Sequence, residues 1–397
     1  MPSAGQHILA INAGSSSLRG DVYRFDAQGP HRELAVEAGR IGAPDAYVTT
    51  RDGGDRSSTR QHALPDHKAA VAELLRELED AGLKAGVVGI GQRVVHGGPR
   101  YVQPSLVTAE MTAYLRDITA LDLTHMPQAI AVIEATGAAY PGTPQIACFD
   151  TAFHAGLPPV ARDFALPRTF AERGIRRYGF HGLSYEYVMQ ALSDIDARAA
   201  RKRIVIAHLG NGASMAAIRD GQCIDTTMGL TPAGGLVMGT RTGDLDPGVL
   251  LALAREGMSL PELSELVNEH SGLLGISGAT ADMQRLVEQS ESDPRAAAAV
   301  AAFCYSARKF LGALTAALGG LDTLVFTGGI GEHAASVRAA ICEGMAFAGL
   351  AIDRALNDQD APVLSTPGST VEVRVIPTNE GLMVARQTAW YLEEKGS

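Results

Sequence analysis

The feature that most restricts the fold of this chain is a repeated motif, used here as a structural device: an apolar run that is followed directly by a turn of glycine and small polar residues. Each run is typical of a strand, and each turn has the residues that tight turns require. The device occurs three times, with runs and turns at residues 8–11 and 12–17, 203–207 and 208–214, and 324–327 and 328–332. In the first two places a second apolar run returns after the turn, which predicts two hairpins of one design and a duplicated architecture.

Helices and further strands are predicted around these hairpins. Apolar residues at helical spacing predict helices at 66–82, 127–137, 295–318 and 380–394. Short apolar runs predict strands at 87–90, 145–149 and 371–376. The polar stretch 51–60 is predicted to be a solvated loop. Mixed strands and helices with a repeated hairpin predict an α/β protein of two similar lobes, and a cleft between such lobes is a usual place for a ligand.

Length and charge narrow the class of protein. The 397 residues exceed what one hydrophobic core usually supports, which predicts two domains. Because 44 acidic residues outnumber 34 basic ones, we expect neither nucleic acid nor an anionic membrane surface as the main partner. The first residues lack a basic, apolar leader and no run of ~20 apolar residues occurs, so we expect a cytoplasmic protein without a membrane span. The four scattered cysteines predict reduced thiols rather than a disulfide or a zinc site.

Residues that can carry chemistry stand at or beside the turns. Glycine turns after buried strands point backbone N–H groups at one place, which suits phosphate, although none matches the P-loop or the dinucleotide-binding pattern. Arg93, His181 and Arg241 stand among glycines, so these cations can approach and neutralise a transferring phosphoryl group. Asp150 follows a predicted strand and Glu380 begins a predicted helix. A carboxylate with phosphate oxygens and water suits Mg²⁺, while a helix-start charge is the alternative interpretation of Glu380.

Taken in order, these segments resemble the acetate kinases of the acetokinase family, within the sugar kinase/Hsp70/actin superfamily. The resemblance runs nearly end to end and depends on the segments 11–17, 93–98, 149–154, 176–182, 207–212, 225–248, 326–332 and 377–380. It implies an α/β protein with two similar lobes of the actin-like ATPase (ribonuclease H-like) fold and an interlobe active-site cleft. The lobes would comprise residues 1–154 with 382–397, and residues 155–381, the second lobe binding nucleotide.

The resemblance also implies a reaction, the reversible transfer of a phosphoryl group from ATP to acetate, which gives acetyl phosphate and ADP. It implies in-line attack by an already ionised carboxylate oxygen, Mg²⁺ with Mn²⁺ able to replace it, and a homodimer formed through the second lobe. Propionate or butyrate is the alternative acceptor within the family. A sugar kinase and a non-kinase ATPase of the actin or Hsp70 type are the alternatives outside it, and the set of cations favours a carboxylate acceptor over a neutral hydroxyl.

Residues carried over from the family's motifs fall into four groups. The resemblance implies catalytic roles for Arg93, Asp150, His181 and Arg241. It implies an acyl-substrate pocket formed by Arg93, Val95, Thr124, His125, Phe180 and Pro232. It implies nucleotide contacts from Arg19, His208, Leu209, Gly210, Asn211, Gly212, Asp282, Met283, Gln284, Gly329, Ile330, Gly331, Glu332 and His333. It implies that Mg²⁺ is held by Asn12 and Glu380.

Several positions depart from the residue that is usual in the family. Arg19 stands where lysine is usual, and its planar guanidinium changes how a phosphate would be contacted. Gln284 stands where arginine is common, and His333 stands where asparagine is usual. Thr124 replaces a usual leucine in the pocket wall. Because a methylene changes binding in a pocket by only ~1–3 kcal/mol, acetate and propionate both remain candidate substrates.

Overall fold

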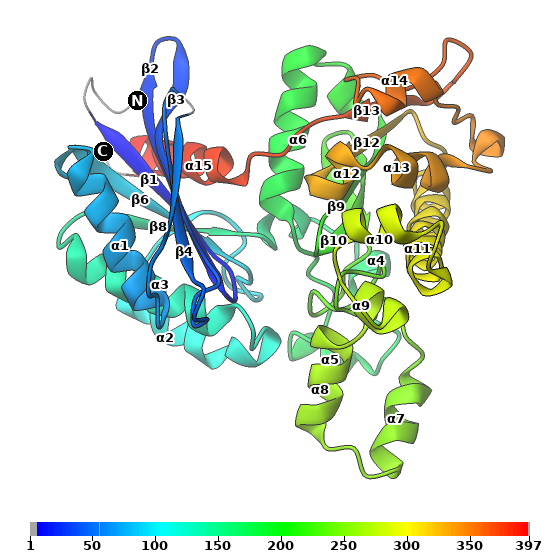
Figure 1. Ribbon diagram of the computed structural model, residues 1–397, viewed down its shortest axis with the longest axis horizontal. Helices are drawn as coiled ribbons and strands as arrows, with labels where there is room; N and C mark the ends of the chain where they lie inside the picture. Colours follow the sequence, from blue (N-terminus) through cyan, green and yellow to red (C-terminus); the bar gives the residue numbers. More distant parts are fainter. Residues whose placement is uncertain (1–5, 55, 396–397) are drawn as a thin grey trace. The chain divides into compact units, whose positions relative to one another are not determined.

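The computed structural model describes residues 6–54 and 56–395, and the chain divides into two compact units. The first unit comprises Met1–Ala152 and Asn379–Ser397, as far as these residues are described, and the second comprises Phe153–Thr378. Figure 1 shows the course of the chain, with the C-terminal helix α15 (Glu380–Lys395) beside the sheet of N-terminal strands. The chain therefore leaves the first unit once and returns to it at its end.

An eight-stranded sheet forms the centre of the first unit. Its spatial order is β5-β4-β3-β2-β1-β6-β8-β7. The strands are β1 His7–Ala13, β2 Ser17–Asp26, β3 Gly29–Gly39, β4 Tyr47–Asp52, β5 Ser57–Gln61, β6 Val87–Val94, β7 Ser105–Leu106 and β8 Gln145–Phe149. β1 runs antiparallel to β2 and parallel to β6, and β6 runs parallel to β8. Parallel strands end at one edge of a sheet, so the residues that follow β6 and β8 lie close together.

Helices pack against this sheet. They are α1 His67–Asp80, α2 Ala109–Asp117, α3 Met126–Ala139 and α15, with short 3₁₀ turns at Lys84–Gly86 and Thr119–Leu121. Apolar side chains of α1 and α3 share one core with β1 to β4 and β6, and α15 packs against β1 and β6. At Gly91 in β6, a Cβ atom would lie 2.3 Å from Thr388 Oγ1 of α15, so only glycine lets this helix approach the sheet. The close packing fixes Glu380 at the start of α15.

The second unit repeats the plan with five strands. Its sheet has the order β11-β10-β9-β12-β13, with β9 Arg203–Leu209, β10 Ala213–Arg219, β11 Gln222–Thr226, β12 Thr323–Thr327 and β13 Glu372–Val375. The pairs β11–β10 and β10–β9 are antiparallel, and β9–β12 and β12–β13 are parallel. The strands β3-β2-β1-β6-β8 of the first sheet have the same succession of neighbours. The predicted α/β fold with a duplicated hairpin is confirmed.

Helices surround the second sheet. They are α4 Pro159–Arg162, α5 Arg168–Glu172, α6 Gly182–Ile195, α7 Pro247–Arg255, α8 Leu260–Glu269, α9 Gly272–Ser277, α10 Met283–Gln289, α11 Pro294–Leu318, α12 Gly328–His333, α13 Ala335–Cys342 and α14 Arg354–Asp358. Single 3₁₀ turns lie at Ala152–His154, Ala199–Arg201 and Ala346–Ala348. Val188 and Leu192 of α6 pack on Ile206 of β9 in the core of this unit. In the described residues, α11 alone has the length and apolar composition that a membrane span needs, and it packs against α9, α10, α13 and β10.

Two of the predicted elements are wrong. The segment 51–60 is not a loop throughout, because its two ends belong to β4 and β5, which form a hairpin at the edge of the first sheet. Both of its strands contain threonine and arginine, and Thr49 and Thr59 bond through their hydroxyl groups at 2.9 Å. A polar edge hairpin has no apolar alternation, so its pattern is not typical of a strand. The segment 328–332, predicted as a turn, instead forms the short helix α12.

The four cysteines, all of which lie in the described residues, form no disulfide and are buried. The predicted reduced thiols are therefore consistent with the structure. Burial raises the pKa values of Cys223, Cys304 and Cys342, which keeps these thiols protonated at neutral pH.

Candidate active site

Arg93 is the centre of a charged cluster in the first unit. It stands near the end of β6, and Asp150 directly follows β8, the parallel neighbour. Arg93 Nη2 donates to Asp150 Oδ2 at 2.6 Å, and Arg93 Nε lies 3.1–3.2 Å from both carboxylate oxygens. The side chain of Asp150 is only 1% exposed, so this two-pronged ion pair lies in a nearly dry environment. The sheet edge therefore presents a rigidly held guanidinium.

Asn12 and Glu380 complete this cluster. Arg93 Nη1 donates to Asn12 Oδ1 at 2.9 Å, and Arg93 Nε lies 3.7 Å from Glu380 Oε2. Burial alone would lower the pKa of Arg93, but the carboxylates of Asp150 and Glu380 outweigh that effect and raise it. The structure thus brings together four residues that the sequence singles out, from β1, β6, the end of β8 and the start of α15.

The same oxygens are suited to a magnesium ion. The amide oxygen of Asn12 and the carboxylate of Glu380 are hard donors, and Mg²⁺ is usually held by one or two carboxylates together with phosphate oxygens and water. No group of three or more His, Cys, Asp or Glu side chains that could hold a metal occurs within residues 6–54 and 56–395. The donor set therefore fits a metal that arrives with a phosphate ligand rather than one in an all-protein cage.

Arg19, expected to contact nucleotide, lies beside this cluster. It pairs with Asn12 across the β1–β2 ladder, which turns both side chains to the same face. Its Nε and Nη2 donate to Asp21 at 2.7 and 3.1 Å, and hydrogen bonding to this carboxylate raises the pKa of Arg19. Asp21 is buried and leaves no room for a side chain at Gly381, whose Cβ would lie 2.6 Å from Asp21 Oδ2. Arg19 is therefore held in place by a buried carboxylate.

His125 lies at the start of α3, next to a carboxylate that the sequence analysis did not select. His125 Nδ1 lies 3.0 Å from Asp122 Oδ2, and the backbone N–H groups of Thr124 and His125 donate to Asp122 Oδ1 at 3.1 and 3.0 Å. Burial would raise the pKa of Asp122, but the bonds from His125 and Thr124 lower it. Asp122 also acts electrostatically on Arg93. Val95, just after β6, is buried in this unit.

His181 is the most constrained of the predicted catalytic residues in the second unit. It has a left-handed backbone conformation, with φ 59°, directly before α6. Its Nδ1 lies 2.9 Å from Ser214 Oγ, which lies 2.5 Å from the hydroxyl of Tyr185. Its ring stacks on that of His208 with 4.2 Å between ring centroids, and Ser184 Oγ lies 2.8 Å from His208 Nδ1. Strained backbone held by such a network is characteristic of functional sites.

Two glycine loops place Arg241 beside His181. Gly239 N donates to Asn211 O at 3.0 Å, and a Cβ at Gly239 would lie 1.9 Å from Asn211 Oδ1, so the loops at 208–212 and 239–243 interlock. A Cβ at Gly212 would lie 3.3 Å from His181 Nε2 and 3.5 Å from Arg241 Nη1. Both nitrogens thus face the same backbone position. The structure brings together His181, His208, Asn211, Gly212 and Arg241.

The predicted pocket residues Phe180 and Pro232 stand close to these cations in the chain. Pro232 O accepts a hydrogen bond from Arg241 Nη1 at 3.2 Å. Phe180 is buried, and its carbonyl accepts from His154 Nε2 at 3.0 Å. Burial lowers the pKa of His154 to about 4, so this ring is neutral and can donate from only one nitrogen. His154 therefore fixes the backbone directly before His181.

The segment Gly329–His333, expected to contact nucleotide, lies in α12. Glu332 Oε1 accepts from Gly328 N at 2.8 Å and from Thr378 N at 3.1 Å, so this carboxylate bonds to its own unit's backbone. The fully buried Arg338 donates to the carbonyls of Gly331 and Glu332 at 3.0 and 2.9 Å. Gly328, with φ 77°, lies against Leu209, so β9 and α12 meet closely. His333 is three-quarters exposed.

The segment Asp282–Gln284 stands at the start of α10. Asp282 Oδ1 accepts from the backbone N–H groups of Gln284 and Arg285 at 2.9 and 3.2 Å and so caps this helix. Met283 is buried, whereas Gln284 is exposed and donates to Glu288 at 3.0 Å. The structure therefore gives Asp282 and Met283 internal contacts and leaves the side chain of Gln284 toward solvent.

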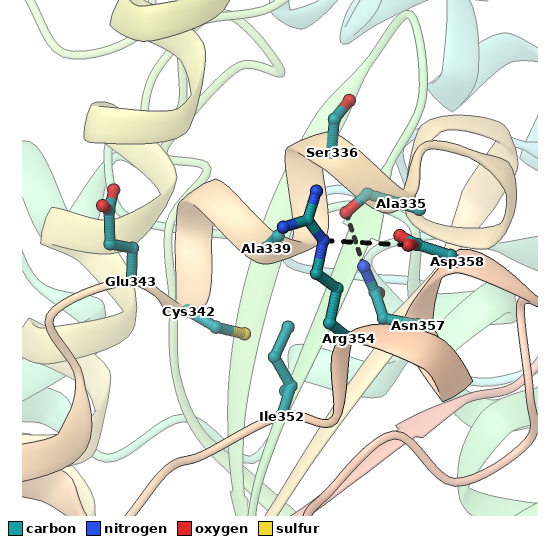
Figure 2. A pocket seen from close by; sticks show the side chains of 9 residues that line it. All are labelled: Ala335, Ser336, Ala339, Cys342, Glu343, Ile352, Arg354, Asn357 and Asp358. Atoms are coloured by element: carbon teal, nitrogen blue, oxygen red, sulfur yellow. Dashed lines mark hydrogen bonds and ion pairs between the residues drawn. The ribbon is translucent and has the colours of Figure 1, made fainter.

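A cavity of about 490 Å³ lies elsewhere in the second unit, between α13 and α14 (Figure 2). Its lining includes Ser336, Cys342, Arg354 and Asp358, with Asn357 bonded across it to the carbonyl of Ala335 at 2.8 Å. None of the residues selected from the sequence lines it. It touches the candidate site only indirectly, because Asn357 also accepts a bond from Arg338 Nε at 2.9 Å.

Four residues that support the site were not found from the sequence, namely Asp21, Asp122, Ser214 and Arg338. Each holds a predicted residue through hydrogen bonds of its side chain. The spacing Asp122–His125 was a readable signal, since an acidic residue before a helix start can bond the following N–H groups. The other three carry no local signal.

Comparison with known proteins shows what this chain is similar to. Residues 7–386 match the sequence model of the Acetokinase family. An acetate kinase of Rhodopseudomonas palustris is 45% identical over 98% of this chain and 99% of its own length. A solved Porphyromonas gingivalis acetate kinase is 34% identical, with a TM-score of 0.87 over 98% of this chain and 100% of its own. A propionate kinase from Francisella tularensis is 34% identical, with a TM-score of 0.91 over 97% of this chain and 99% of its own.

Proposed function

Because this chain belongs to the acetokinase family, we propose that it is an ATP:acetate phosphotransferase, a kinase whose acceptor is a carboxylate. The observation that carries this proposal is the cluster around Arg93. Its bonds to Asp150 and Asn12 leave one N–H on each Nη nitrogen, and such a pair fits two oxygens of a carboxylate or phosphoryl group. A kinase that acts on a neutral hydroxyl would need a general base instead.

In the proposed reaction, a carboxylate oxygen of acetate attacks the γ-phosphorus of ATP in line with the leaving oxygen of ADP. One O–P bond forms and one breaks, and no proton has to move because acetate is already ionised at neutral pH. Asp150 therefore acts by holding Arg93, and the two-pronged ion pair explains why a carboxylate is needed there. Catalysis by this chain consists of positioning and neutralisation of charge.

His181 and Arg241 are proposed to stabilise the transferring phosphoryl group. Support comes from their nitrogens, which face the same position at Gly212, and from the network of Ser214 and Tyr185 that fixes the His181 ring. The glycine loop at 208–212 and helix α12 are proposed to contact the nucleotide, with Arg19 near the phosphates. Backbone N–H groups and fixed cations are the groups that phosphate binding uses.

Asn12 and Glu380 are proposed to hold Mg²⁺ through their oxygens. When bound, the ion would neutralise phosphate charge, as in other phosphoryl transfers. Mn²⁺ has similar ligand preferences and is proposed to replace it. Glu380 stands at the start of α15 beside Arg93, so its carboxylate is placed by the helix rather than by a mobile loop.

The reaction is tested by incubating the protein with ATP, Mg²⁺ and hydroxylamine, which traps acyl phosphates as hydroxamates. Acetate should give acetyl hydroxamate, and glycerol should consume no ATP. Hydroxamate from none of acetate, propionate and butyrate would rule out the proposed function.

Propionate is the second candidate acceptor, because Thr124 stands in the expected pocket and a solved propionate kinase is similar to this chain. The ratio of kcat/KM for the two acids decides between them.

The protein is further proposed to act as a cytoplasmic homodimer, without nucleic acid or membrane partners. Helices α7 and α8 carry no buried residue, although Val249, Leu251 and Leu260 are apolar and between 41% and 80% exposed. An apolar surface of this kind is characteristic of a protein–protein contact. A second copy of the chain is the proposed partner, since homodimers with twofold symmetry are the commonest assemblies.

A further inference from the structure

Asp122 and His125 form a closely bonded pair in the first unit, and the reaction as described so far gives Asp122 no role. Asp122 is only 3% exposed in its side chain, and His125 is 19% exposed. One carboxylate oxygen, Oδ1, accepts two backbone N–H groups and so fixes the turn before α3. Both oxygens lie 3.0–3.1 Å from His125 Nδ1. The carboxylate thus holds the ring and the turn together.

This arrangement decides which nitrogen of the ring is available. An ionised carboxylate can only accept hydrogen bonds, so Nδ1 must carry the hydrogen. Within the described residues, no hydrogen bond or ion pair engages His125 Nε2. The ring therefore has one committed nitrogen and one that a ligand can meet.

The pair also belongs to the neighbourhood of Arg93. Asp122 is among the carboxylates whose charge acts on Arg93, together with Asp150 and Glu380. Val94, the residue after Arg93 in β6, shares an apolar cluster with Met126, the residue after His125. His125 thus belongs to the same part of the first unit as the guanidinium that the proposed function assigns to the acyl substrate.

We propose that Asp122 is a positioning residue for the acyl substrate, which holds the His125 ring by Nδ1 so that Nε2 is presented to a negatively charged substrate oxygen. Such an oxygen bonds Nε2 only when the ring carries a second hydrogen. The inference rests on the proposed function and deepens it, because it names a residue that selects for an anionic acceptor.

Asp122→Asn tests the proposal, because asparagine keeps an oxygen for the two backbone N–H groups but turns an NH₂ group toward Nδ1. We expect the KM for acetate to rise ~10-fold while kcat changes less than about threefold. Asp117→Asn is the matched control, since Asp117 is exposed in α2, and it should leave both constants unchanged. A KM within about twofold of the control would overturn the proposal.

Coupling between the two residues separates positioning from a general structural effect. His125→Gln should raise the KM by itself, and adding Asp122→Asn to it should change the KM by less than about twofold. Effects that multiply instead would show that Asp122 acts independently of His125 and would overturn the proposal.

The unaltered protein provides a readout that does not depend on the folding of a variant. In ¹⁵N-histidine spectra at a pH where the rings are neutral, the His125 signals, identified by their loss in His125→Gln, should report hydrogen on Nδ1. Hydrogen on Nε2 would overturn the proposal. If the unaltered protein forms no acyl phosphate, the proposed function fails, whereas the spectrum still decides whether Asp122 holds the ring.

Discussion

Arg93 and Asp150 form a two-pronged ion pair in which Nη2 lies 2.6 Å from Oδ2 and the carboxylate is almost completely excluded from solvent. The two residues come from the ends of parallel neighbouring strands, so the sheet itself sets their distance. Glu380, 3.7 Å from Arg93, adds a second negative charge. The pair therefore couples the stability of the first unit to the position of the guanidinium that is proposed to bind the substrate.

Asp150→Asn should reduce both stability and activity, because it leaves a buried guanidinium with only part of its counter-charge. We expect the free energy of unfolding to fall by about 3 kcal/mol and kcat/KM to fall at least ~10²-fold. Urea unfolding and the hydroxamate assay measure the two effects. The double variant Arg93→Met with Asp150→Asn should regain stability but no activity; if it is less stable than Asp150→Asn, the ion pair is not the cause of the loss.

Arg241→Ala should abolish most of the turnover and leave the fold intact. Arg241 is half-buried and bonds through Nη1 to Pro232 O, so its removal costs the fold little, whereas a fixed cation on a transferring phosphoryl group contributes ~10²–10³-fold to kcat. Steady-state kinetics and circular dichroism check the two statements. Arg354→Ala, at an almost fully exposed arginine, is the control. Activity within about threefold of the unaltered protein would contradict the assigned role.

Glu380→Gln should raise the Mg²⁺ concentration needed for half-maximal activity by ~10-fold, because a neutral amide holds the ion less well than a carboxylate. Glu394→Gln is a matched control, since Glu394 is exposed in the same helix. The measurement is a Mg²⁺ titration of activity at constant free ATP. Superimposable titrations of the two variants would leave Glu380 with the helix-start role that its sequence position also suggests.

Much of the fold could be predicted from the sequence because its elements are local. Apolar runs at β8 and helical spacing in α11 and α15 mark their own bounds to within a few residues. The polar hairpin β4–β5 and helix α12 could not be predicted in this way, because hydrogen bonds from other parts of the chain stabilise them. Glu332 and Arg338, for example, hold α12 through backbone groups that sequence spacing does not reveal.

The candidate site likewise has a part that the sequence predicts and a part that depends on contacts formed only in the folded chain. Motifs place Arg93, Asp150 and Glu380 in the sequence, and the structure brings them together around one guanidinium. The side chains that orient them were not predictable, since Asp21 and Ser214 act only through contacts made after folding. Gly212 lies between two of these groups, since a Cβ there would be 3.3 Å from His181 Nε2 and 3.5 Å from Arg241 Nη1. A motif therefore predicts which side chains come together but not which other side chains hold them.

The buried His154 should make the second unit sensitive to acid. Its pKa is lowered to about 4 by burial, whereas the unfolded chain takes up this proton below its ordinary value near ~6.5. Stability is therefore lost as the pH falls from 6.5 to 4, by about 3 kcal/mol in total, and the pH dependence of stability above that range does not involve this residue.

His154→Gln should be less stable at pH 7 but should lose less stability on acidification, as urea unfolding at pH 7 and pH 4.5 would show. The same pH slope in His154→Gln as in the half-exposed control His31→Gln would contradict this reading.

Leu251→Glu should convert the proposed dimer into a monomer. Leu251 is 57% exposed on α7, and a carboxylate there would have to be desolvated against the partner surface, which two copies would do twice in a symmetric contact. Val160→Glu is the control, because Val160 is a 92% exposed apolar residue on α4, outside α7 and α8. Light scattering after size exclusion should give about 83 kDa, twice 41.6 kDa, for the unaltered protein and for Val160→Glu, and about 42 kDa for Leu251→Glu. An unaltered protein of 41.6 kDa would refute the dimer itself, and a dimeric Leu251→Glu would place the contact on another surface.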